Sequence, residues 1–505
     1  MVKCAGETES DAHDDVLVAN VHPSEWQNPT PARSYNLVVI GAGTAGLVSA
    51  AGAAGLGAKV ALVESHLLGG ECLNVGCVPS KALIACSRAA HAAARAAQFG
   101  VCTGDVAVDF DRVMARVRRV RSQISFHDAA KRFRSMGIDV FFGQARFIDE
   151  RTVEVDGLKL PFARAVIATG ARAVRPAIDG IDSCDFLTNE TLFSLRERPG
   201  RLGVVGAGPV GVEMAQAFKR LSSDVTIIEK GQSLHPREDR DATAILEESF
   251  RRDGVNMLLN TVVERITASE GGKTIHLAGD GAHRKVIVDE ILIGAGRAPN
   301  VQGLALEAAG VEYDQRAGVK TDDFLRTTNR RVYAAGDVCL RHKFTHTADA
   351  AARIVIQNAL FFGRKRVSVL NIPWCTYTDP EIAHVGLYPE EARSRGMEVE
   401  TFRRDLTDVD RAICDGQIEG FVKVHVKQGT DSILGATIVA AHAGDMISEI
   451  STAMAGKVGL AGISSVIHPY PTQAEVIRQV ADAYNRTRLS ARLKSILVAI
   501  MKIRR

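Results

Sequence analysis

The sequence predicts an α/β protein with two copies of one βαβ unit, the first interrupted by the second, and a smaller α+β domain after them. Three observations support this prediction. A glycine-rich turn separates a strand from a helix at residue 41, a second such turn begins at residue 206, and short strands and helices follow Pro373. A chain of 505 residues is also too long for one hydrophobic core, so several domains are expected.

Composition excludes several classes of protein. Apolar residues make up 46% of the chain, charged residues make up 24%, and the formal net charge is +3, which is typical of a globular protein and not of a nucleic-acid binder. Nine cysteines are an odd number, which argues against a secreted disulfide framework. The polar, acidic N-terminus lacks the apolar core of a signal peptide, and no run of about 18 apolar residues follows. We therefore expect a cytoplasmic protein.

The first βαβ unit follows a polar arm that contains three prolines and that we expect to be flexible or draped over the body. Strands are expected at 36–40 and 59–64, with a turn at 41–46 and a helix at 47–56 between them. Alternation of strand and helix around a tight turn is the plan of a Rossmann-like unit.

The turn of this unit reads G-x-G-x-x-G, which is typical of a dinucleotide site. Gly41 makes the turn, Gly43 lets the backbone approach a pyrophosphate, and Gly46 allows close packing of helix and strand. The N-terminal amides of the helix hold phosphates. Glu64, at the end of the next strand, can accept hydrogen bonds from a ribose diol.

The second unit repeats this arrangement and predicts a second dinucleotide site. Its motif glycines are Gly206, Gly208 and Gly211. Glu229 ends the following strand, where a carboxylate suits the free 2′-hydroxyl of NADH and repels the 2′-phosphate of NADPH. NADH is therefore preferred, although Lys230 and Arg237 lie near enough in sequence to bind a phosphate.

Two cysteines, Cys72 and Cys77, follow the first unit and enter the next helix. They can form a disulfide if the first helical turn brings them together, and a helix N-terminus lowers a thiol pKa. Two alternatives stay open: unrelated buried cysteines, or half of a zinc site. No second CxxC or HxxxH cluster in the sequence completes such a zinc site.

The segment from Gly69 to Lys81, GGECLNVGCVPSK, resembles the active-site signature of the class I pyridine nucleotide-disulfide oxidoreductases, and the resemblance covers about residues 35–485. It implies an enzyme that passes electrons from NAD(P)H, through FAD, to a redox-active pair at Cys72 and Cys77 and on to an acceptor. It also implies two Rossmann-like dinucleotide-binding domains, with the FAD domain interrupted by the NAD(P) domain, and a C-terminal α+β dimerisation domain.

The resemblance and the composition together predict the domain boundaries. They are an N-terminal arm (1–34), an FAD-binding domain (35–180 and 300–370), an NAD(P)H-binding domain (181–299), a C-terminal dimerisation domain (371–485) and a basic amphipathic tail (486–505).

The resemblance also assigns roles to individual residues. Cys77 is expected to be the thiolate nearest the flavin, and Cys72 the interchange thiol that meets the acceptor. Lys81 is expected beside the flavin N5, paired with Glu213. The FAD-binding residues implied are Gly41, Gly43, Gly46, Glu64, Gly70, Lys81, Thr169, Gly170, Gly336 and Asp337. Those implied for NAD(P) are Gly206, Gly208, Gly211, Glu229 and Gly296.

One segment departs from the family pattern. Glutathione and lipoamide reductases carry His-Pro-Thr, with a Glu three residues after the Thr, and the His is the acid/base for thiol exchange. Aligning Pro-Thr and Glu475 places Tyr470 at the position of that base. A phenol with a pKa of about 10 is a poor base at neutral pH. His468 is offset by two residues, roughly 6–7 Å of extended chain, so we expect it to be structural or peripheral.

A tyrosine at this position resembles the mercuric reductase branch, whose acceptor is a soft metal ion that needs thiolate ligands more than a proton shuttle. Cys72 and Cys77 would then bind the metal substrate. That branch also has an adjacent cysteine pair at its C-terminus and usually an N-terminal metal-binding module. Here the last cysteine is Cys414, and Cys4 stands alone in the arm, so efficient mercury reduction is in doubt.

The acceptor therefore stays open between a soft metal ion and a small molecule. Two alternative functions remain: a dihydrolipoamide dehydrogenase-like enzyme, and a flavin-binding redox sensor without catalysis. In this family the C-terminal loop of one subunit completes the active site of the other. The resemblance thus implies a homodimer in which Tyr470 and Glu475 act in trans.

Two basic segments remain. After Asp482 no acidic residue follows, and basic residues alternate with aliphatic ones at helical spacing, which predicts a basic amphipathic helix. Attachment to an anionic membrane and packing on the subunit or its dimer partner are both consistent with it. The basic residues around 112–134 are interpreted as a solvated helix face and not as a nucleic-acid site.

Overall fold

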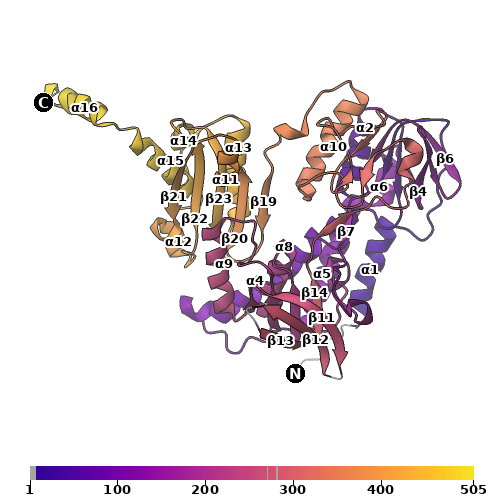
Figure 1. Cartoon of the computed structure of the whole chain (residues 1–505), viewed down its shortest axis with the longest axis horizontal. Helices are drawn as coiled ribbons and strands as arrows, with labels where there is room; N and C mark the ends of the chain where they lie inside the picture. Colours follow the sequence, from indigo (N-terminus) through magenta and orange to yellow (C-terminus); the bar gives the residue numbers. More distant parts are fainter. Residues whose placement is uncertain (1–6, 270, 280–281, 505) are drawn as a thin grey trace. The chain divides into compact units, whose positions relative to one another are not determined.

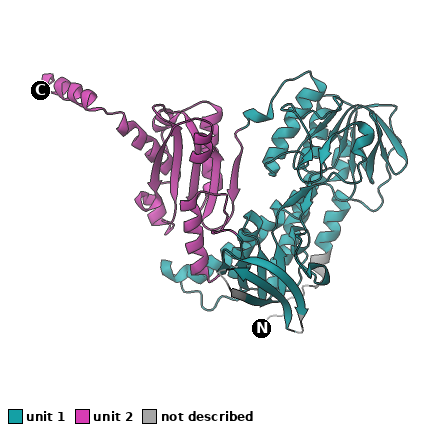
Figure 2. Ribbon diagram, viewed as in Figure 1, with its two compact units in different colours: residues 1–230, 256–370 teal, residues 231–255, 371–505 magenta. Residues whose placement is uncertain are grey.

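The structure is a computed structural model that describes residues 7–269, 271–279 and 282–504. Cys4 and Arg505 therefore lie outside the described residues. The chain divides into two compact units (Figure 2), residues 1–230 with 256–370 and residues 231–255 with 371–505. The domain boundaries given above remain predictions.

The first unit is built around a sheet that begins with the predicted βαβ unit (Figure 1). Its strands are, in spatial order, β3 (Asp139–Phe142), β2 (Val60–Glu64), β1 (Tyr35–Ile40), β6 (Leu158–Ile167), β5 (Thr152–Val155) and β4 (Ala145–Asp149). β1, β2 and β3 run parallel, and β6 returns parallel to β1. β18 (Val332–Ala334) pairs in parallel with β6. Because β18 follows the whole second dinucleotide unit, the first domain is interrupted, as predicted.

Strand β1 is buried on both faces, which explains its continuous run of apolar residues. Leu37 and Val39 belong to the core on one face of the sheet, and Val38 and Ile40 belong to the core on the other. Successive side chains of a strand point to opposite faces. The first of these cores also includes buried residues of α2 (Thr44–Gly55) and α10 (Thr345–Leu360).

The predicted N-terminal arm contains a helix, α1 (Glu7–Val21), which the sequence analysis did not predict. Leu17 and Val21 are fully buried in the core of the first unit. Their four-residue spacing places them on one helix face. The apolar residues of α1 cluster in its second half and do not follow a clear helical period, so only the tertiary contact with α5 (Phe110–Ser125) reveals this helix.

The interpretation of the basic residues around 112–134 as a solvated face is wrong for three of them. Arg118 on α5 is only 2% exposed, and the Arg121 guanidinium lies 3.5 Å from Asp14 of α1. Arg116 donates a hydrogen bond to the carbonyl of Ala82. Arginine stems cover apolar surface while their heads find partners, so these three pack within the unit. The other basic residues of the segment are exposed, as interpreted: Arg112, Arg119, Lys131, Arg132 and Arg134.

The second dinucleotide unit has its own parallel sheet. Its strands are, in spatial order, β10 (Asn256–Leu258), β9 (Asp224–Ile228), β8 (Arg201–Val205) and β14 (Glu290–Ile293). Helix α8 (Pro209–Arg220) follows β8. An antiparallel sheet, β11 (Val262–Ser269), β12 (Gly272–Gly279) and β13 (Ala282–Val288), is inserted before β14. β15 (Arg297–Pro299) pairs with β7 (Ala171–Ala173), where the chain returns to the first domain.

The second unit has an antiparallel sheet whose spatial order is β19 (Pro373–Thr376), β20 (Glu381–Gly386), β23 (Ile433–Ala440), β22 (Phe421–Lys427) and β21 (Val399–Asp405). Its helices include α11 (Pro389–Ser394), α12 (Asp410–Cys414), α13 (Ala443–Ala455), α14 (Leu460–Ser464), α15 (Glu475–Thr487) and α16 (Ala491–Ile503). The sheet shares one core with α12, α13, α14 and α15. This is the predicted α+β domain.

Residues 231–255, with helix α9 (Arg240–Asp253), group with this second unit although they fall in the predicted 181–299 segment. Both carboxylate oxygens of Glu238 are engaged: the Trp374 indole and the Tyr388 hydroxyl each donate to one of them at 2.6 Å. Lys423 binds Asp239 at 2.9 Å. These buried contacts join residues far apart in the sequence, so composition alone did not indicate them.

Candidate active site

The first glycine-rich turn forms a cradle in which side chains have no room. Gly41 has a φ of +98°, and a Cβ there would lie 2.5 Å from the carbonyl oxygen of Ala168. A Cβ at Gly46 would overlap the carbonyl oxygen of Gly41. Gly70, with φ +56°, lies so close to Gly43 that its Cβ would be 2.6 Å from the Gly43 Cα. Gly46 therefore packs against Gly41, and Gly70 packs against Gly43.

The N-terminus of α2 faces this cradle with free donors. The helix begins after Gly43, and among the described residues no side chain caps it. The amide of Ala42 donates to Glu64 Oε2 at 2.7 Å, which fixes the carboxylate beside the turn. Uncapped helix N-terminal amides are suited to phosphate groups, so this end of the helix fits the pyrophosphate of a dinucleotide.

Other residues predicted to bind FAD belong to the same domain. Thr169 and Asn300 bond reciprocally: the Thr169 hydroxyl donates to the Asn300 carbonyl at 2.7 Å, and the Asn300 amide donates to the Thr169 carbonyl at 2.9 Å. Gly170 (φ +69°) and Gly336 (φ +80°) hold backbone conformations that favour glycine. A Cβ at Gly336 would lie 3.1 Å from Ala45 of α2. The residues present fit FAD at this end of the sheet.

The two cysteines lie on either side of a short break between helices. Cys72 is within α3 (Gly70–Asn74), and Cys77 is the first residue of α4 (Cys77–Arg95). Both are free thiols, and they lie close enough for each to shift the pKa of the other. Cys77 Sγ also lies 3.4 Å from the hydroxyl of Thr345, at the start of α10. The fold therefore brings the two thiols close together.

The environment makes the two thiols unequal. The hydrogen bond from Cys72 lowers the pKa of Cys77 to about 6, and the Thr345 hydroxyl and the charge of Lys81 act in the same direction. The same cysteine-cysteine hydrogen bond, together with burial, raises the pKa of Cys72. These opposite shifts favour the proton on Cys72 and the thiolate on Cys77.

Lys81, one turn into α4, forms the ion pair that the resemblance implied. Its Nζ lies 2.9 Å from Glu213 Oε2. The Glu213 side chain is 5% exposed and belongs to α8 of the other dinucleotide unit, whereas the Lys81 side chain is 37% exposed. Burial of the carboxylate makes this pair sensitive to the loss of either partner.

A second ionic cluster was missed by the sequence analysis. Arg297 pairs with Glu71, the residue before Cys72, and also lies 3.1 Å from Asp337 Oδ2. The carbonyl of Asp337 accepts a hydrogen bond from Lys343 at 2.6 Å. Arg297 lies in the segment GAGRAPN (residues 294–300), which is part of the family resemblance. Only the fold, however, brings residues 71, 297 and 337 together.

The second glycine-rich turn repeats the geometry of the first. Gly206 has a φ of +99°, and a Cβ at Gly211 would overlap the Gly206 carbonyl oxygen. The amide of Ala207 donates to Glu229 Oε2 at 2.8 Å, and Glu229 is 8% exposed. Gly208 has open space around it, as expected where a ligand approaches the backbone. Gly296 also has open space and a φ of +113°.

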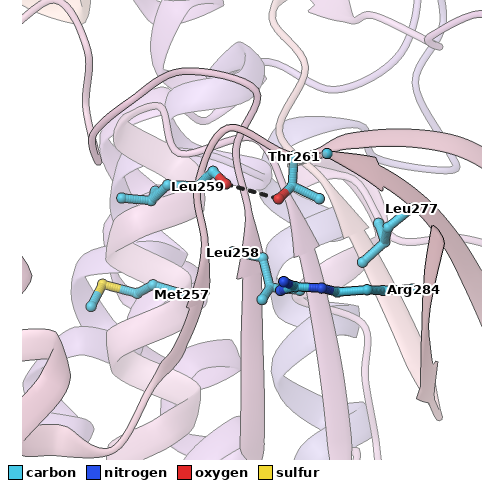
Figure 3. Close-up of a pocket in the computed structure, with 7 residues that line it drawn as sticks. Met257, Leu258, Leu259, Thr261, Leu277 and Arg284 are labelled. Carbon is cyan, nitrogen blue, oxygen red and sulfur yellow. Dashed lines mark hydrogen bonds between the residues drawn. The ribbon is translucent and has the colours of Figure 1, made fainter. Parts of the chain in front are cut away.

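A cavity of about 160 Å³ lies beside this second site (Figure 3). It adjoins Glu229, since the amide of Glu229 donates to the carbonyl of Leu258 and Thr261 donates to the carbonyl of Glu229. Its lining is mainly aliphatic, with Arg284 extending across it. The lining residues are Met257, Leu258, Leu259, Thr261, Leu277, Gly279 and Arg284. None of the residues predicted to bind NAD(P) is among them.

The loop that was expected to act in trans belongs to the second unit. Tyr470 is 70% exposed and donates to Asp410 Oδ2 at 2.9 Å, and this hydrogen bond raises the pKa of the phenol. Glu475 pairs with Arg478 at 2.6 Å. The His468 ring lies 2.8 Å from Glu449 Oε1 with its side chain 6% exposed, a structural setting.

Comparison with family models identifies both parts of the chain. Residues 35–352 match the pyridine nucleotide-disulphide oxidoreductase model, and residues 372–481 match the dimerisation domain of the same family. The chain belongs to the pyridine nucleotide-disulphide oxidoreductases. The protein is therefore an NAD(P)H-dependent flavoprotein oxidoreductase with a disulfide redox centre, and its dimerisation domain supports a homodimer.

Relatives within the family differ in their acceptors. The chain is 33% identical to the mercuric reductase of Lysinibacillus sphaericus, over 90% of this chain and 83% of the relative. It is 31% identical to a dihydrolipoyl dehydrogenase of Cupriavidus necator, over 91% of this chain and all of the relative. A solved Cu(II) complex of the HOCl-induced flavoprotein disulfide reductase RclA from Escherichia coli is 30% identical, with a TM-score of 0.78 over 88% of this chain and 98% of RclA.

Neither a membrane-spanning helix nor a cluster of metal ligands occurs in the part of the chain that the structure describes. Within residues 7–269, 271–279 and 282–504, no helix is both long and apolar enough to cross a membrane. In the same part of the chain, no three His, Cys, Asp or Glu side chains are grouped so as to hold a metal ion.

Proposed function

We propose that this oxidoreductase reduces a thiophilic metal ion, Hg(II) or Cu(II), at the Cys72–Cys77 pair with electrons from NADH. The first glycine-rich turn and Glu64 would hold FAD, whose chemistry when bound is the relay of two electrons from the nicotinamide to the cysteine pair. The resulting dithiol would reduce one Hg(II) to Hg(0), or two Cu(II) to two Cu(I), and return to the disulfide with loss of its protons.

The observation that carries this proposal is the state of Tyr470. Thiol-disulfide exchange needs an acid/base near neutral pH. Hydrogen bonding to Asp410 raises the pKa of the Tyr470 phenol further from that range. A metal ion needs thiolate ligands instead. The lowered pKa of Cys77, about 6, supplies a thiolate at neutral pH without a separate base.

Within this proposal each side chain has a defined task. Cys77 would be the thiolate nearest the flavin, and Cys72 the thiol that meets the acceptor. Lys81 would stand beside the flavin with its charge fixed by Glu213, 2.9 Å away. Asp337, held by Arg297, would bind the ribityl region of the cofactor. In the homodimer, Tyr470 and Glu475 would reach the partner's site.

The relatives support a metal acceptor without deciding which one. Mercuric reductases and a Cu(II) complex of RclA are among the proteins that this chain resembles. No two cysteines are adjacent in the 505 residues, whereas the resemblance to the mercuric reductase branch led us to expect such a pair. We therefore rank Cu(II) above Hg(II) as the substrate of rapid turnover.

NADH is the proposed electron donor because of Glu229. Its carboxylate is held at the strand end by the Ala207 amide, 2.8 Å away. A 2′-phosphate would meet this negative charge, whereas a 2′-hydroxyl would donate to it.

A dihydrolipoamide dehydrogenase is the second candidate, favoured by the His468–Glu449 pair at 2.8 Å. A histidine held by a carboxylate is an acid/base arrangement, so a different loop path in the dimer would make it catalytic. Activity with dihydrolipoamide that disappears in His468→Gln and persists in Tyr470→Phe would establish this candidate and refute the first.

The deciding experiment is an acceptor panel with the FAD-loaded enzyme: Cu(II), Hg(II), lipoamide, glutathione disulfide and a quinone, each with NADH and NADPH. We expect metal-dependent NADH oxidation and lipoamide turnover at least about 100-fold slower. Cys72→Ser and Cys77→Ser should each lower metal reduction by about 1,000-fold or more while diaphorase activity with the quinone persists. Negligible metal turnover by the wild-type enzyme, unchanged in both serine variants, would support a flavin redox sensor without catalysis instead.

A further inference from the structure

The C-terminal helix α16 (Ala491–Ile503) is an apolar helix without a covering surface within the described chain. The preceding helix, α15 (Glu475–Thr487), buries Val476, Ile477, Val480, Ala481 and Tyr484. By contrast, none of the residues of α16, all of them described, is buried. The N-terminus of the helix is nevertheless capped, because the Ser490 hydroxyl accepts a hydrogen bond from the Leu493 amide at 3.2 Å.

Most of the large aliphatic side chains of α16 gather on one face, whereas Val498 lies on the opposite side. Each member of this face lies three or four residues from at least one other member, the spacing of one helical stripe. Their exposed fractions range from 41% at Leu497 to 85% at Ile503. The stripe consists of Leu493, Ile496, Leu497, Ile500 and Ile503, with Met501 at its edge. A face this apolar is not stable in water alone, so it needs a partner.

The charges around this face have a single sign. The last 20 residues contain seven of the 62 Lys and Arg residues and none of the 59 Asp and Glu residues. The rest of the chain therefore has 55 basic against 59 acidic residues. Lys494 and Arg492 fall on the two sides of the aliphatic stripe by helical spacing, and Lys502 falls opposite it. The basic charge is thus concentrated on the segment that carries the uncovered apolar face.

We propose that α16 docks on an anionic phospholipid surface and holds the enzyme at a membrane. An apolar stripe bordered by Lys and Arg is the arrangement of helices that lie in the lipid interface, with the stripe in the acyl region and the cations among the phosphates. At 13 residues the helix is about 20 Å long. That is shorter than the roughly 30 Å hydrocarbon core, so it lies along the surface and does not cross it.

This choice of partner rests on charge complementarity. A neutral lipid or apolar protein groove would cover the stripe but would leave seven cations without counter-charges. A lipid surface with phosphate headgroups meets both requirements at one depth. Redox chemistry at Cys72 and Cys77 does not enter this inference, so it is independent of the acceptor.

The test uses the full-length FAD-loaded enzyme and vesicle co-sedimentation. The vesicles are pure phosphatidylcholine or phosphatidylcholine with about 30 mol % phosphatidylglycerol, an anionic content in the range of natural membranes. We expect the enzyme to pellet with the anionic vesicles only, and the bound fraction to fall as salt is raised. Equal pelleting with both vesicle types, or none with either, would overturn the proposal.

Two double variants with the same charge change separate the apolar stripe from net charge. Ile496→Asp with Ile500→Asp places two acids on the stripe, and Ser495→Asp with Ala499→Asp places two acids on the polar side. The stripe variant should lower the vesicle partition coefficient by about 100-fold or more and the polar-side control by about 10-fold. NADH-quinone activity should stay unchanged in both, which shows that the protein is folded.

Sedimentation velocity without lipid tests the competing partner, a second copy of the chain. If the stripe covers a subunit interface, the stripe variant will dissociate the dimer and the wild-type enzyme will not bind anionic vesicles. That result would refute the lipid proposal. An unchanged dimer together with lost vesicle binding would support it.

Discussion

The two glycine-rich turns of this protein have nearly the same local geometry but different surroundings. Gly41 and Gly206 have φ values of +98° and +99°, and each turn donates one amide to the carboxylate at the end of the next strand, at 2.7 and 2.8 Å. The same sequence pattern thus produces the same structure twice.

The surroundings decide what each turn can do. The first turn is closed by Gly70 of the segment that carries the cysteine pair, and by the return of the chain at Gly336. The second turn has open space at Gly208 and a cavity beside Glu229. A closed site suits a cofactor that stays bound, whereas an open site suits a cosubstrate that exchanges at every turnover.

The largest effect is expected from valine at the third glycine of each turn. Gly46→Val and Gly211→Val each drive side-chain atoms into a backbone carbonyl, at a cost of about 3 kcal/mol or more. Gly46→Val should abolish flavin binding, whereas Gly211→Val should retain bound FAD and lose NADH oxidation. Visible absorbance and stopped-flow flavin reduction measure the two outcomes.

Gly55→Ala at the end of α2, where a Cβ meets no atom within 4 Å, is the control for Gly46→Val and should behave as wild type. Loss of FAD from both valine variants to the same extent would contradict the separation of the two sites.

The next largest effect is expected from alanine at the second glycine of each turn. This substitution tests how closely the ligand approaches the backbone without disturbing the fold. Gly208 has open space for a Cβ, and a Cβ at Gly43 would lie 3.8 Å from Gly70. Gly208→Ala should raise the KM for NADH by about 10-fold with an unchanged melting temperature. Gly43→Ala should raise the Kd for FAD by a similar factor. A melting temperature that falls in the FAD-free proteins would instead indicate a packing role.

A smaller effect is expected from the carboxylate that ends the second unit. Glu229→Ala removes the charge that opposes a 2′-phosphate, so the NADH/NADPH ratio of kcat/KM should fall by about 10-fold. Glu64→Ala should leave that ratio unchanged, because Glu64 serves the other turn. An unchanged ratio in Glu229→Ala would indicate that Lys230 and Arg237 determine nucleotide selectivity.

The smallest effect is expected at the Cys72–Cys77 pair, which follows the first dinucleotide unit and has no counterpart after the second. Because the pKa of Cys77 is lowered to about 6, its thiolate persists above that pH and is protonated as the pH falls through it. The rate of Cys77 alkylation in the reduced enzyme should therefore decrease as the pH is lowered, with a midpoint near pH 6. Lys81→Met removes a stabilising positive charge and should shift this midpoint upward by about one unit or less. A midpoint near 9 in the wild-type enzyme would contradict the assignment.

The sequence by itself determined the elements whose requirements are local. The glycine motifs specify strand, turn and helix because backbone approach and φ above zero require glycine at fixed positions. The spacing of Cys72 and Cys77 at a helix start likewise predicted a thiol pair, and basic residues at helical spacing predicted α16. Each of these signals lies within a few dozen consecutive residues.

Only the tertiary structure decided which distant residues share a site. It joined Arg297 to Glu71 and Asp337, placed Thr345 against Cys77, and gave Tyr470 the partner Asp410. It also buried one face of α1 and the Arg118 side chain of α5. Chain topology determines which counter-ion a charged side chain meets. Local composition does not encode that topology, so these pairings could not be predicted from the sequence.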